Sequence, residues 1–289
     1  GKGIVGDDIS GETRYAAAAA LGAGLTVFLA TRIGMPISTT HGLVGALVGA
    51  GWTAGSAIDH GKLGAAFFLP LIVSPLMAMT AAAVCFPLLR MCRRRLGIDS
   101  ETCFCVGQEI VEVVPASQNV AVLQKVEQLS ARLDSEVVCR YRYRGRVLGI
   151  PVSTAVDRVH YLSAGVVCFA RGLNDTPKIA ALLLVVATFN NLAALSAVGL
   201  FMALGGILSA RRVAETMSRK ITPMDHGQAL TANLVSGVII IAASRLGLPV
   251  STTHVTCGSL FFIGGRTRRA QLAPFATILA AWGTALPLG

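Results

Sequence analysis

Hydrophobic residues along this chain of 289 residues gather in long blocks, and polar residues gather between them. The blocks are rich in Ala, Leu, Val, Ile and Gly, and they cover 13–53, 64–90, 159–209, 226–264 and 271–289. About 20 apolar residues suffice to cross a bilayer as a helix, so the longer blocks can hold two passes with a Gly/Pro break between them. The pattern therefore predicts an all-α membrane protein, a helical bundle of about eight passes at 13–33, 36–53, 64–90, 159–183, 185–209, 226–246, 249–264 and 271–289.

Residues 91–158 differ from these blocks because they hold many charged residues of both signs. Runs such as 111–114 predict short strands, whereas apolar residues at helical spacing predict a helix within 117–138, marked by Val120, Leu123, Val126, Leu129 and Leu133. We therefore expect a small soluble α+β insert that docks partners, regulates, or serves as a solvated linker. The predicted domains are 1–90, an incomplete first membrane half, 91–158, the insert, and 159–289, the second membrane half.

Composition supports a membrane protein and excludes a disordered chain. The mean hydropathy is +0.65 and 14% of residues are charged, against about 25% in a typical soluble domain. The net charge of +10 arises largely from Arg-rich segments between apolar blocks, and such segments usually face the cytoplasm. We therefore expect 91–158, 210–225 and 265–270 to be cytoplasmic, and 1–12 and 54–63 to be external.

The seven cysteines predict neither a disulfide framework nor a metal site. They are odd in number and scattered, and several lie in apolar runs. Cys103 and Cys105 form C-x-C, which is not the usual C-x2-C zinc spacing. The cysteines therefore predict no metal site. No cluster of His, Asp and Glu with ligand spacing lies within a pass, so no catalytic residue is predicted either.

An internal repeat is the strongest signal in the chain. The segment 30–41 recurs at 243–254 with an offset of 213, and eight of its twelve positions are identical. Five predicted passes separate the two copies, and an odd number inverts the second relative to the first. The alternative is that the 36–53 segment only dips into the membrane and returns, which makes the number even. Inverted repeats and broken helices are typical of secondary transporters, whose binding site lies at the repeat interface.

The repeat also indicates a missing element. The second half holds a polar motif at Asn174-Asp175-Thr176, and the equivalent position in the first half would fall before residue 1. We therefore expect an N-terminally truncated chain. The alternative is that the second half acquired an extra element.

Each copy of the repeat contains Pro-x-Ser-Thr-Thr-His, which predicts an anion site. Pro36 and Pro249 lack a backbone N–H and break a helix, and a half-helix that begins there points free N–H groups at the break. The hydroxyls that follow are further donors. The alternative is an ordinary N-cap, but two copies in pseudo-symmetric positions favour an anion site formed by Ser38, Thr39, Thr40, Ser251, Thr252 and Thr253.

The motif around Asp175 places charges inside an apolar block, where they are costly and usually functional. Asp175 could bind a cation or carry a proton, and Lys178 could pair with Asp175 or face an anion. The alternative is a purely structural ion pair. His41 and His254 could carry protons, although packing histidines are the favoured interpretation.

The two Pro-Ile/Val-Ser-Thr-Thr-His segments, together with 172–175, resemble the inorganic phosphate transporter (PiT) family, bacterial type. The resemblance implies one phosphate and its coupling cations between two inverted halves. It also implies residence in the bacterial inner membrane. By motif, the implied phosphate ligands are Asn174, Asp175, Thr176, Ser38, Thr39, Thr40, Ser251, Thr252 and Thr253, and the implied cation-coupling residues are Asp175 and Lys178.

One residue departs from that family pattern, which usually has a second Asn where this chain has Lys178. A fixed ammonium there could replace a bound sodium ion, which favours proton coupling. The sequence thus predicts a secondary active transporter, not an enzyme, that imports phosphate by proton or sodium symport without another cofactor. The alternatives are a transporter of sulfate or another oxyanion, and a truncated remnant that does not transport. The predicted partners are inorganic phosphate and membrane lipid, with no nucleic acid and a homo-oligomer left open.

Overall fold

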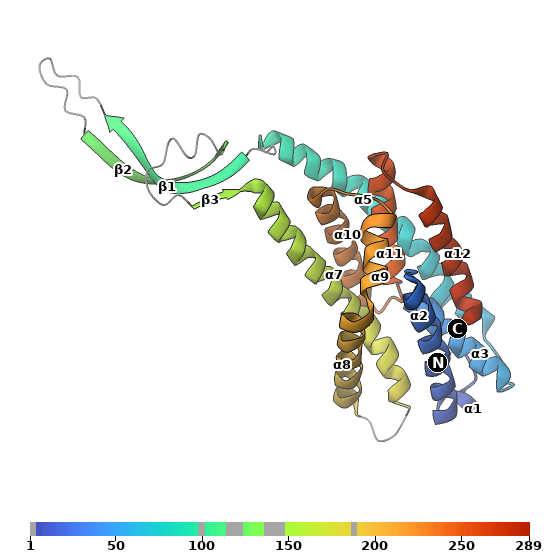
Figure 1. Cartoon of the computed structure of the whole chain (residues 1–289). Coiled ribbons are helices and arrows are strands. Elements are labelled where there is room, and N and C mark those ends of the chain that lie inside the picture. Colours follow the sequence, from blue (N-terminus) through green and yellow to red (C-terminus); the bar gives the residue numbers. More distant parts are fainter. Residues whose placement is uncertain (1–3, 98–101, 114–123, 136–147, 186–189) are drawn as a thin grey trace, which may run out of the picture. The chain divides into compact units, whose positions relative to one another are not determined.

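The structure is a computed structural model that describes residues 4–97, 102–113, 124–135, 148–185 and 190–289 (Figure 1). The chain divides into two compact units. Unit 1 combines residues 1–86 with 163–289, and unit 2 comprises residues 87–162. Two helices, α5 (Leu69–Arg95) and α7 (Val152–Leu183), contribute residues to both units.

Unit 1 is helical in its described part. Besides portions of α5 and α7, it contains two short π-helical segments, η1 (Leu63–Phe68) and η2 (Thr216–Lys220). Its α-helices are α1 (Asp7–Ser10), α2 (Thr13–Ile33), α3 (Thr39–Thr53), α4 (His60–Lys62), α8 (Asn191–Ser209), α9 (Arg211–Glu215), α10 (His226–Arg245), α11 (Thr252–Arg266) and α12 (Leu272–Leu288).

Every predicted pass corresponds to a helix, so the predicted fold class is confirmed. Within the described residues, four helices are long and apolar enough to cross a membrane: Thr13–Ile33, His60–Arg95, Asn191–Ser209 and His226–Arg245. By contrast, α3 and α11 have 15 residues each. At 1.5 Å per residue they extend about 22 Å, which is shorter than the hydrocarbon core of a bilayer. They are therefore half-helices that begin in the protein interior.

The two copies of the repeat adopt the same local structure. Gly34 and Gly247 end α2 and α10 with φ angles of +76° and +67°, a left-handed conformation that glycine adopts without steric cost. A Pro follows two residues later in each copy, and the chain re-enters a helix at α3 or α11. From these breaks, α3 and α11 run toward opposite ends of unit 1 (Figure 1), as expected for an inverted repeat.

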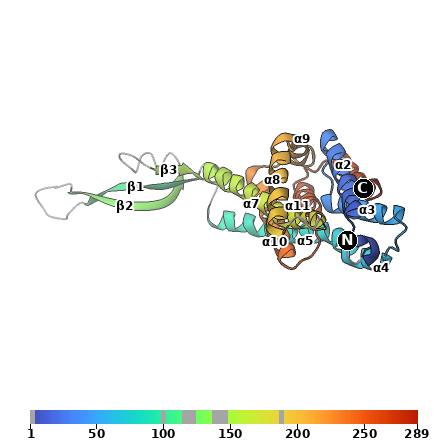
Figure 2. The ribbon, with the colours of Figure 1, turned by 90° about the horizontal axis from the view of Figure 1, so that it is seen from below.

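Small residues allow the helices of unit 1 to pack closely. Helices α2, α3 and α12 lie side by side (Figure 2), and a second cluster joins α5, α10, α11 and α12 around Trp282. On α11, a side chain added at Gly258 would lie 2.5 Å from the carbonyl oxygen of Pro75. The outward faces carry exposed large apolar residues, which suit contact with lipid, including Leu21, Leu25, Leu29 and Ile33 on α2.

Unit 2 contains an antiparallel sheet with the order β2–β1–β3. Its strands are β1 (Thr102–Val113), β2 (Gln124–Ser135) and β3 (Leu148–Pro151), and Val111 pairs with Val126. The prediction of a helix within 117–138 is wrong for 124–135, because pairing along the whole of β1 satisfies that backbone as a strand. The apolar positions 126, 129 and 133 do not discriminate between the two structures over so short a segment. The rest of that predicted helix lies outside the described residues.

Candidate functional site

The first turns of α3 and α11 meet in the interior of unit 1. Ser38 and Ser251 are the N-caps, and each Oγ accepts a hydrogen bond of 3.2 Å from the backbone N–H of the histidine three residues later. Both serines are 1% exposed. The hydroxyl of Thr253 donates to the carbonyl oxygen of Ile37 over 3.0 Å, which joins the first turn of α11 to the break before α3. The serines thus act as caps at a buried junction between the repeats.

Asp175 and Asn174 of α7 lie at this junction and contact both copies. The carboxylate of Asp175, 2% exposed, accepts from the hydroxyl of Thr39 at 3.2 Å and from Nδ2 of Asn174 at 2.8 Å. Nδ2 of Asn174 also donates to the carbonyl oxygen of Val250 at 3.1 Å, in the break before α11. The motif therefore connects the first repeat to the second.

Lys178 completes the same face of α7. Its Nζ donates to Oγ1 of Thr40 and to the carbonyl oxygen of Val250, each at 3.1 Å, and lies 3.7 Å from Oδ1 of Asp175. The ion pair between Asp175 and Lys178 that the sequence allowed is therefore present. Its cation also contacts oxygens from both copies of the repeat.

Arg171 is a site residue to which the sequence analysis gave no role. Its Nε donates to the hydroxyl of Thr252 at 3.1 Å and its Nη2 to that of Thr253 at 2.8 Å, while Nε lies 4.0 Å from Oδ2 of Asp175. The spacing of 171, 175 and 178 places these charges along one helix face. The sequence feature that could have identified Arg171 as a site residue is its position inside an apolar block, where a charged side chain is costly and usually functional.

The junction has the chemistry of an oxyanion site. Two cationic side chains, Arg171 and Lys178, accompany one carboxylate, Asp175, and the surrounding Ser and Thr hydroxyls are further donors. Guanidinium groups match the geometry of phosphate-like oxyanions, and hydrogen bonds to charged groups are roughly twice as strong as neutral ones. The helix N-termini add positive partial charge at the same place.

Thr176 is not brought to the junction. Its hydroxyl donates to the sulfur of Met202 on α8 at 3.5 Å. The other predicted ligand residues are buried or half-buried at the junction: Ser38, Thr39, Thr40, Asn174, Asp175, Ser251, Thr252 and Thr253.

The two repeat histidines pack together behind the junction. The ring centroids of His41 and His254 lie 4.7 Å apart, and His254 lies 3.7 Å from the ring of Trp282. Nε1 of Trp282 donates to the carbonyl oxygen of Pro36 at 3.1 Å. Nδ1 of His254 lies 3.1 Å from the carbonyl oxygen of Leu71. These contacts give both histidines a packing role.

A cavity of about 510 Å³ lies beside the first repeat, lined by Arg171, by Thr39 and by residues of α2, α7 and α8. Several residues that line this cavity have repeat equivalents, 213 positions later, that pack against α7. There, a Cβ at Gly237 would lie 3.3 Å from Val166, and Ser244, Val250 and Thr252 bond to Asn174 or Arg171. The equivalent cavity residues are Gly24, Thr31, Ile37 and Thr39. By repeat symmetry, the cavity corresponds to the surface on which α7 packs in the second repeat.

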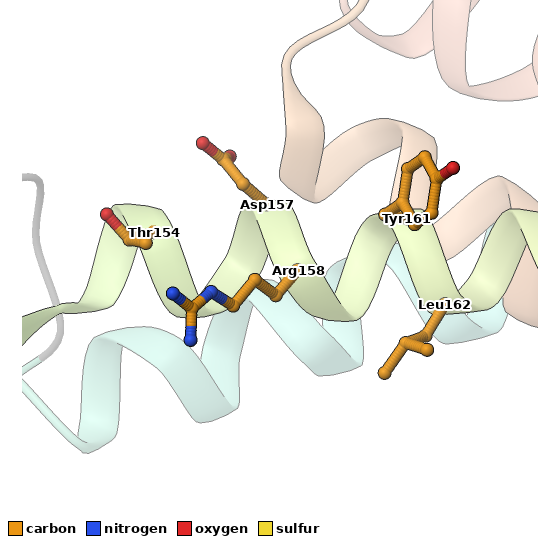
Figure 3. Close-up of a pocket in the computed structure, with 5 residues that line it drawn as sticks. All are labelled: Thr154, Asp157, Arg158, Tyr161 and Leu162. Carbon is orange, nitrogen blue, oxygen red and sulfur yellow. The ribbon is translucent and has the colours of Figure 1, made fainter.

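A second pocket, of about 480 Å³, lies along the first turns of α7 in unit 2 (Figure 3). Its lining residues are Thr154, Asp157, Arg158, Tyr161 and Leu162, which all come from one helix. This pocket lacks the convergent donors of the junction. In the described ranges, no group of three or more His, Cys, Asp or Glu side chains is placed to hold a metal ion.

An inverted-repeat helical bundle with polar groups converging on its broken helices has the architecture of a secondary transporter. The model of the phosphate transporter family matches residues 1–289, so the chain belongs to that family.

Two relatives named "Putative phosphate permease" are each 28% identical to this chain. One, from Thermococcus kodakarensis, aligns over 86% of this chain and 68% of its own length, and the other, from Chlamydia pneumoniae, over 97% and 78%. A solved structure titled as the sodium-dependent phosphate transporter shares the fold, with a TM-score of 0.67, 21% identity, and coverage of 99% of this chain and 80% of that one.

Proposed function

We propose that this protein is a secondary active transporter that imports inorganic phosphate across a bacterial inner membrane by cation symport. The observation that supports it most is the buried junction, where threonines in the first turns of two half-helices bond to charged residues of α7: Thr39 to Asp175, and Thr252 and Thr253 to Arg171. Family membership supports phosphate as the substrate. In the proposed orientation residues 91–158 are cytoplasmic.

The junction supplies the donors that a phosphate ion needs when it leaves water. A dehydrated anion is costly in the protein interior unless hydrogen bonds and opposite charges replace its hydration shell. The guanidinium of Arg171 and the hydroxyl of Thr252 are donors from α7 and α11. The hydroxyl of Thr39 on α3 donates to Asp175 and becomes a third donor when it turns from the carboxylate to the anion. Because α3 and α11 belong to inverted repeats, opposite rocking of the two halves would expose the anion first to one side and then to the other.

Cation coupling is proposed for the same site. Asp175 is buried and bears the negative charge that a proton, a sodium ion or the ammonium of Lys178 can balance. A carboxylate also suits phosphate over sulfate, because protonated phosphate can donate a hydrogen bond to it and fully ionised sulfate cannot. Competition by unlabelled sulfate against labelled phosphate uptake distinguishes the two substrates.

Removing one hydroxyl from each repeat tests the proposed binding site. We expect Thr39→Ala combined with Thr252→Ala to raise the KM for phosphate by about a hundredfold or more, since each of the two lost hydrogen bonds to a charged ligand is worth about 1.5–3 kcal/mol. The measurement is uptake of labelled phosphate into proteoliposomes. Thr277→Ala on α12 is the matched control, because its exposed hydroxyl bonds only to the carbonyl oxygen of Ala273 in the same helix. A KM equal to that of the control would exclude the junction as the phosphate site.

A second candidate function is a membrane protein that binds phosphate but does not transport it by itself. The observation that favours this candidate is the cavity beside the first repeat. In the second repeat α7 covers the equivalent surface, so the two repeats enclose the junction unequally. Residues 1–289 reconstituted into liposomes distinguish the candidates. Phosphate binding with saturable uptake supports the transporter, and phosphate binding without uptake supports the second candidate.

A further inference from the structure

We propose that the ammonium of Lys178 is a built-in cation that occupies a sodium-type site, so that phosphate transport by this protein does not require sodium at this position. The inference rests on the proposed transport function and specifies its coupling ion. It starts from the three oxygen atoms around Nζ of Lys178.

The oxygens around this ammonium are of the kinds that bind sodium in transporters. They are the hydroxyl of Thr40 in the first turn of α3, the backbone carbonyl of Val250 in the break before α11, and the carboxylate of Asp175 in α7. Carbonyl oxygens of unwound segments are characteristic sodium ligands in broken-helix transporters. Because the three oxygens come from α3, from the break before α11 and from α7, the geometry of the site depends on the packing of the two repeats against each other.

An ammonium fits such a site because it carries one unit charge and three N–H donors, which match the three oxygens. Hydrogen bonds of 3.1 Å to Thr40 and Val250 use two of these donors, and the ammonium faces the carboxylate of Asp175 across 3.7 Å as an ion pair. The group is not free to bind phosphate while these contacts persist. Arg171 instead has the free donors, since its described hydrogen bonds use one N–H of Nε and one of Nη2. The two cations therefore have different roles: Lys178 neutralises Asp175 and Arg171 binds the anion.

The tether gives the ammonium an advantage over a free ion. Lys178 follows Asp175 by three residues on α7, and its side chain is 21% exposed, so the charge is held at the site at a high effective concentration. A free sodium ion would have to displace it and leave the ammonium without its oxygen partners. We therefore expect no free sodium ion to bind at this position.

Sodium-specific thermal stabilisation of the detergent-solubilised protein, without phosphate, tests the proposal independently of transport. In wild type, replacing choline chloride by sodium chloride at constant ionic strength is expected to leave Tm unchanged. In Lys178→Ala, which leaves the three oxygens unoccupied, and in Lys178→Asn, which adds a carbonyl oxygen, sodium is expected to raise Tm by several degrees. Phosphate uptake by wild-type proteoliposomes is expected to continue in choline medium.

The matched control is Lys62→Ala, because Lys62 also lies three residues after its acidic partner, with Nζ 3.4 Å from Asp59, but is exposed. This variant should show no sodium effect. The proposal is overturned if wild-type uptake requires sodium, or if both Lys178 variants fold and neither gains sodium-specific stabilisation. Should Lys178→Ala fail to fold, Lys178→Asn alone decides. Loss of phosphate binding in wild type would instead overturn the proposed function.

Discussion

Replacing Asp175 with Asn is expected to reduce kcat/KM for phosphate uptake by about a hundredfold or more. The carboxylate accepts hydrogen bonds from Thr39 and Asn174, and it neutralises Lys178. Hydrogen bonds to a charged group are worth about 1.5–3 kcal/mol each, and each 1.4 kcal/mol is a factor of ten, so loss of the two that order the junction accounts for this reduction. Leaving Lys178 without its partner also lowers folding stability. Uptake of labelled phosphate into proteoliposomes measures the effect, and the thermal midpoint of the purified variant reports whether it folds.

The control for this substitution is Asp59→Asn at the N-cap of the short helix α4. The backbone N–H of Lys62 lowers the pKa of Asp59, so the control also removes a negative charge near neutral pH. Because Asn caps helices as well as Asp, this variant should keep wild-type uptake. Asp175→Asn should also make sulfate a better competitor, since the repulsive carboxylate is gone. Uptake unchanged in a folded Asp175→Asn protein would remove Asp175 from the site.

Replacing Arg171 with Gln is expected to raise the KM for phosphate by about ten- to a hundredfold with a smaller change in kcat. The guanidinium bonds to Thr252 and Thr253, lines the cavity beside Thr39, and has a 47% exposed side chain, so it can receive an incoming anion. A charged hydrogen bond is worth about 1.5–3 kcal/mol. Arg171→Lys should recover part of the affinity, because it keeps the charge but not the planar donors.

Arg211→Gln is the matched control for Arg171. It also breaks an Arg–acid pair four residues apart, since Nε of Arg211 lies 3.1 Å from Oε1 of Glu215, but this pair is exposed. Exposed pairs contribute about 0–1 kcal/mol, so uptake should be unchanged. If the KM and kcat of Arg171→Gln were as unchanged as those of Arg211→Gln, Arg171 would have no part in anion binding.

The sequence predicted the elements of the junction because the doubled motif carries their local causes. A Gly that accepts a left-handed conformation, a Pro that interrupts the helix, and a Ser that caps the next one recur at an offset of 213. These effects act over a few residues, so the pattern alone located both half-helices. The count of apolar segments predicted the inversion only if 36–53 crosses the membrane. In the structure α3 is a half-helix, and the inversion is seen instead in the opposite directions of α3 and α11 (Figure 1).

The sequence did not predict features that depend on contacts between distant segments. The pairing of Arg171 with Thr252 and Thr253 requires α7 to pack against the second repeat, which no local pattern specifies. Thr176 follows Asp175 directly, yet one residue along a helix turns the side chain by about 100°, toward α8. Likewise β2 is a strand because β1 pairs with it, although its apolar spacing also suits a helix.

The most direct test of the proposed phosphate site is to locate a heavier tetrahedral oxyanion in the protein. Arsenate has the shape and charge of phosphate, and anomalous diffraction at the arsenic edge locates it without ambiguity. We expect one strong peak at the junction, with oxygens in hydrogen-bonding reach of Thr39, Thr252 and Arg171, and no peak there in the Thr39→Ala/Thr252→Ala variant. A peak elsewhere in the helical unit, with an empty junction in wild-type protein, would contradict the proposed site.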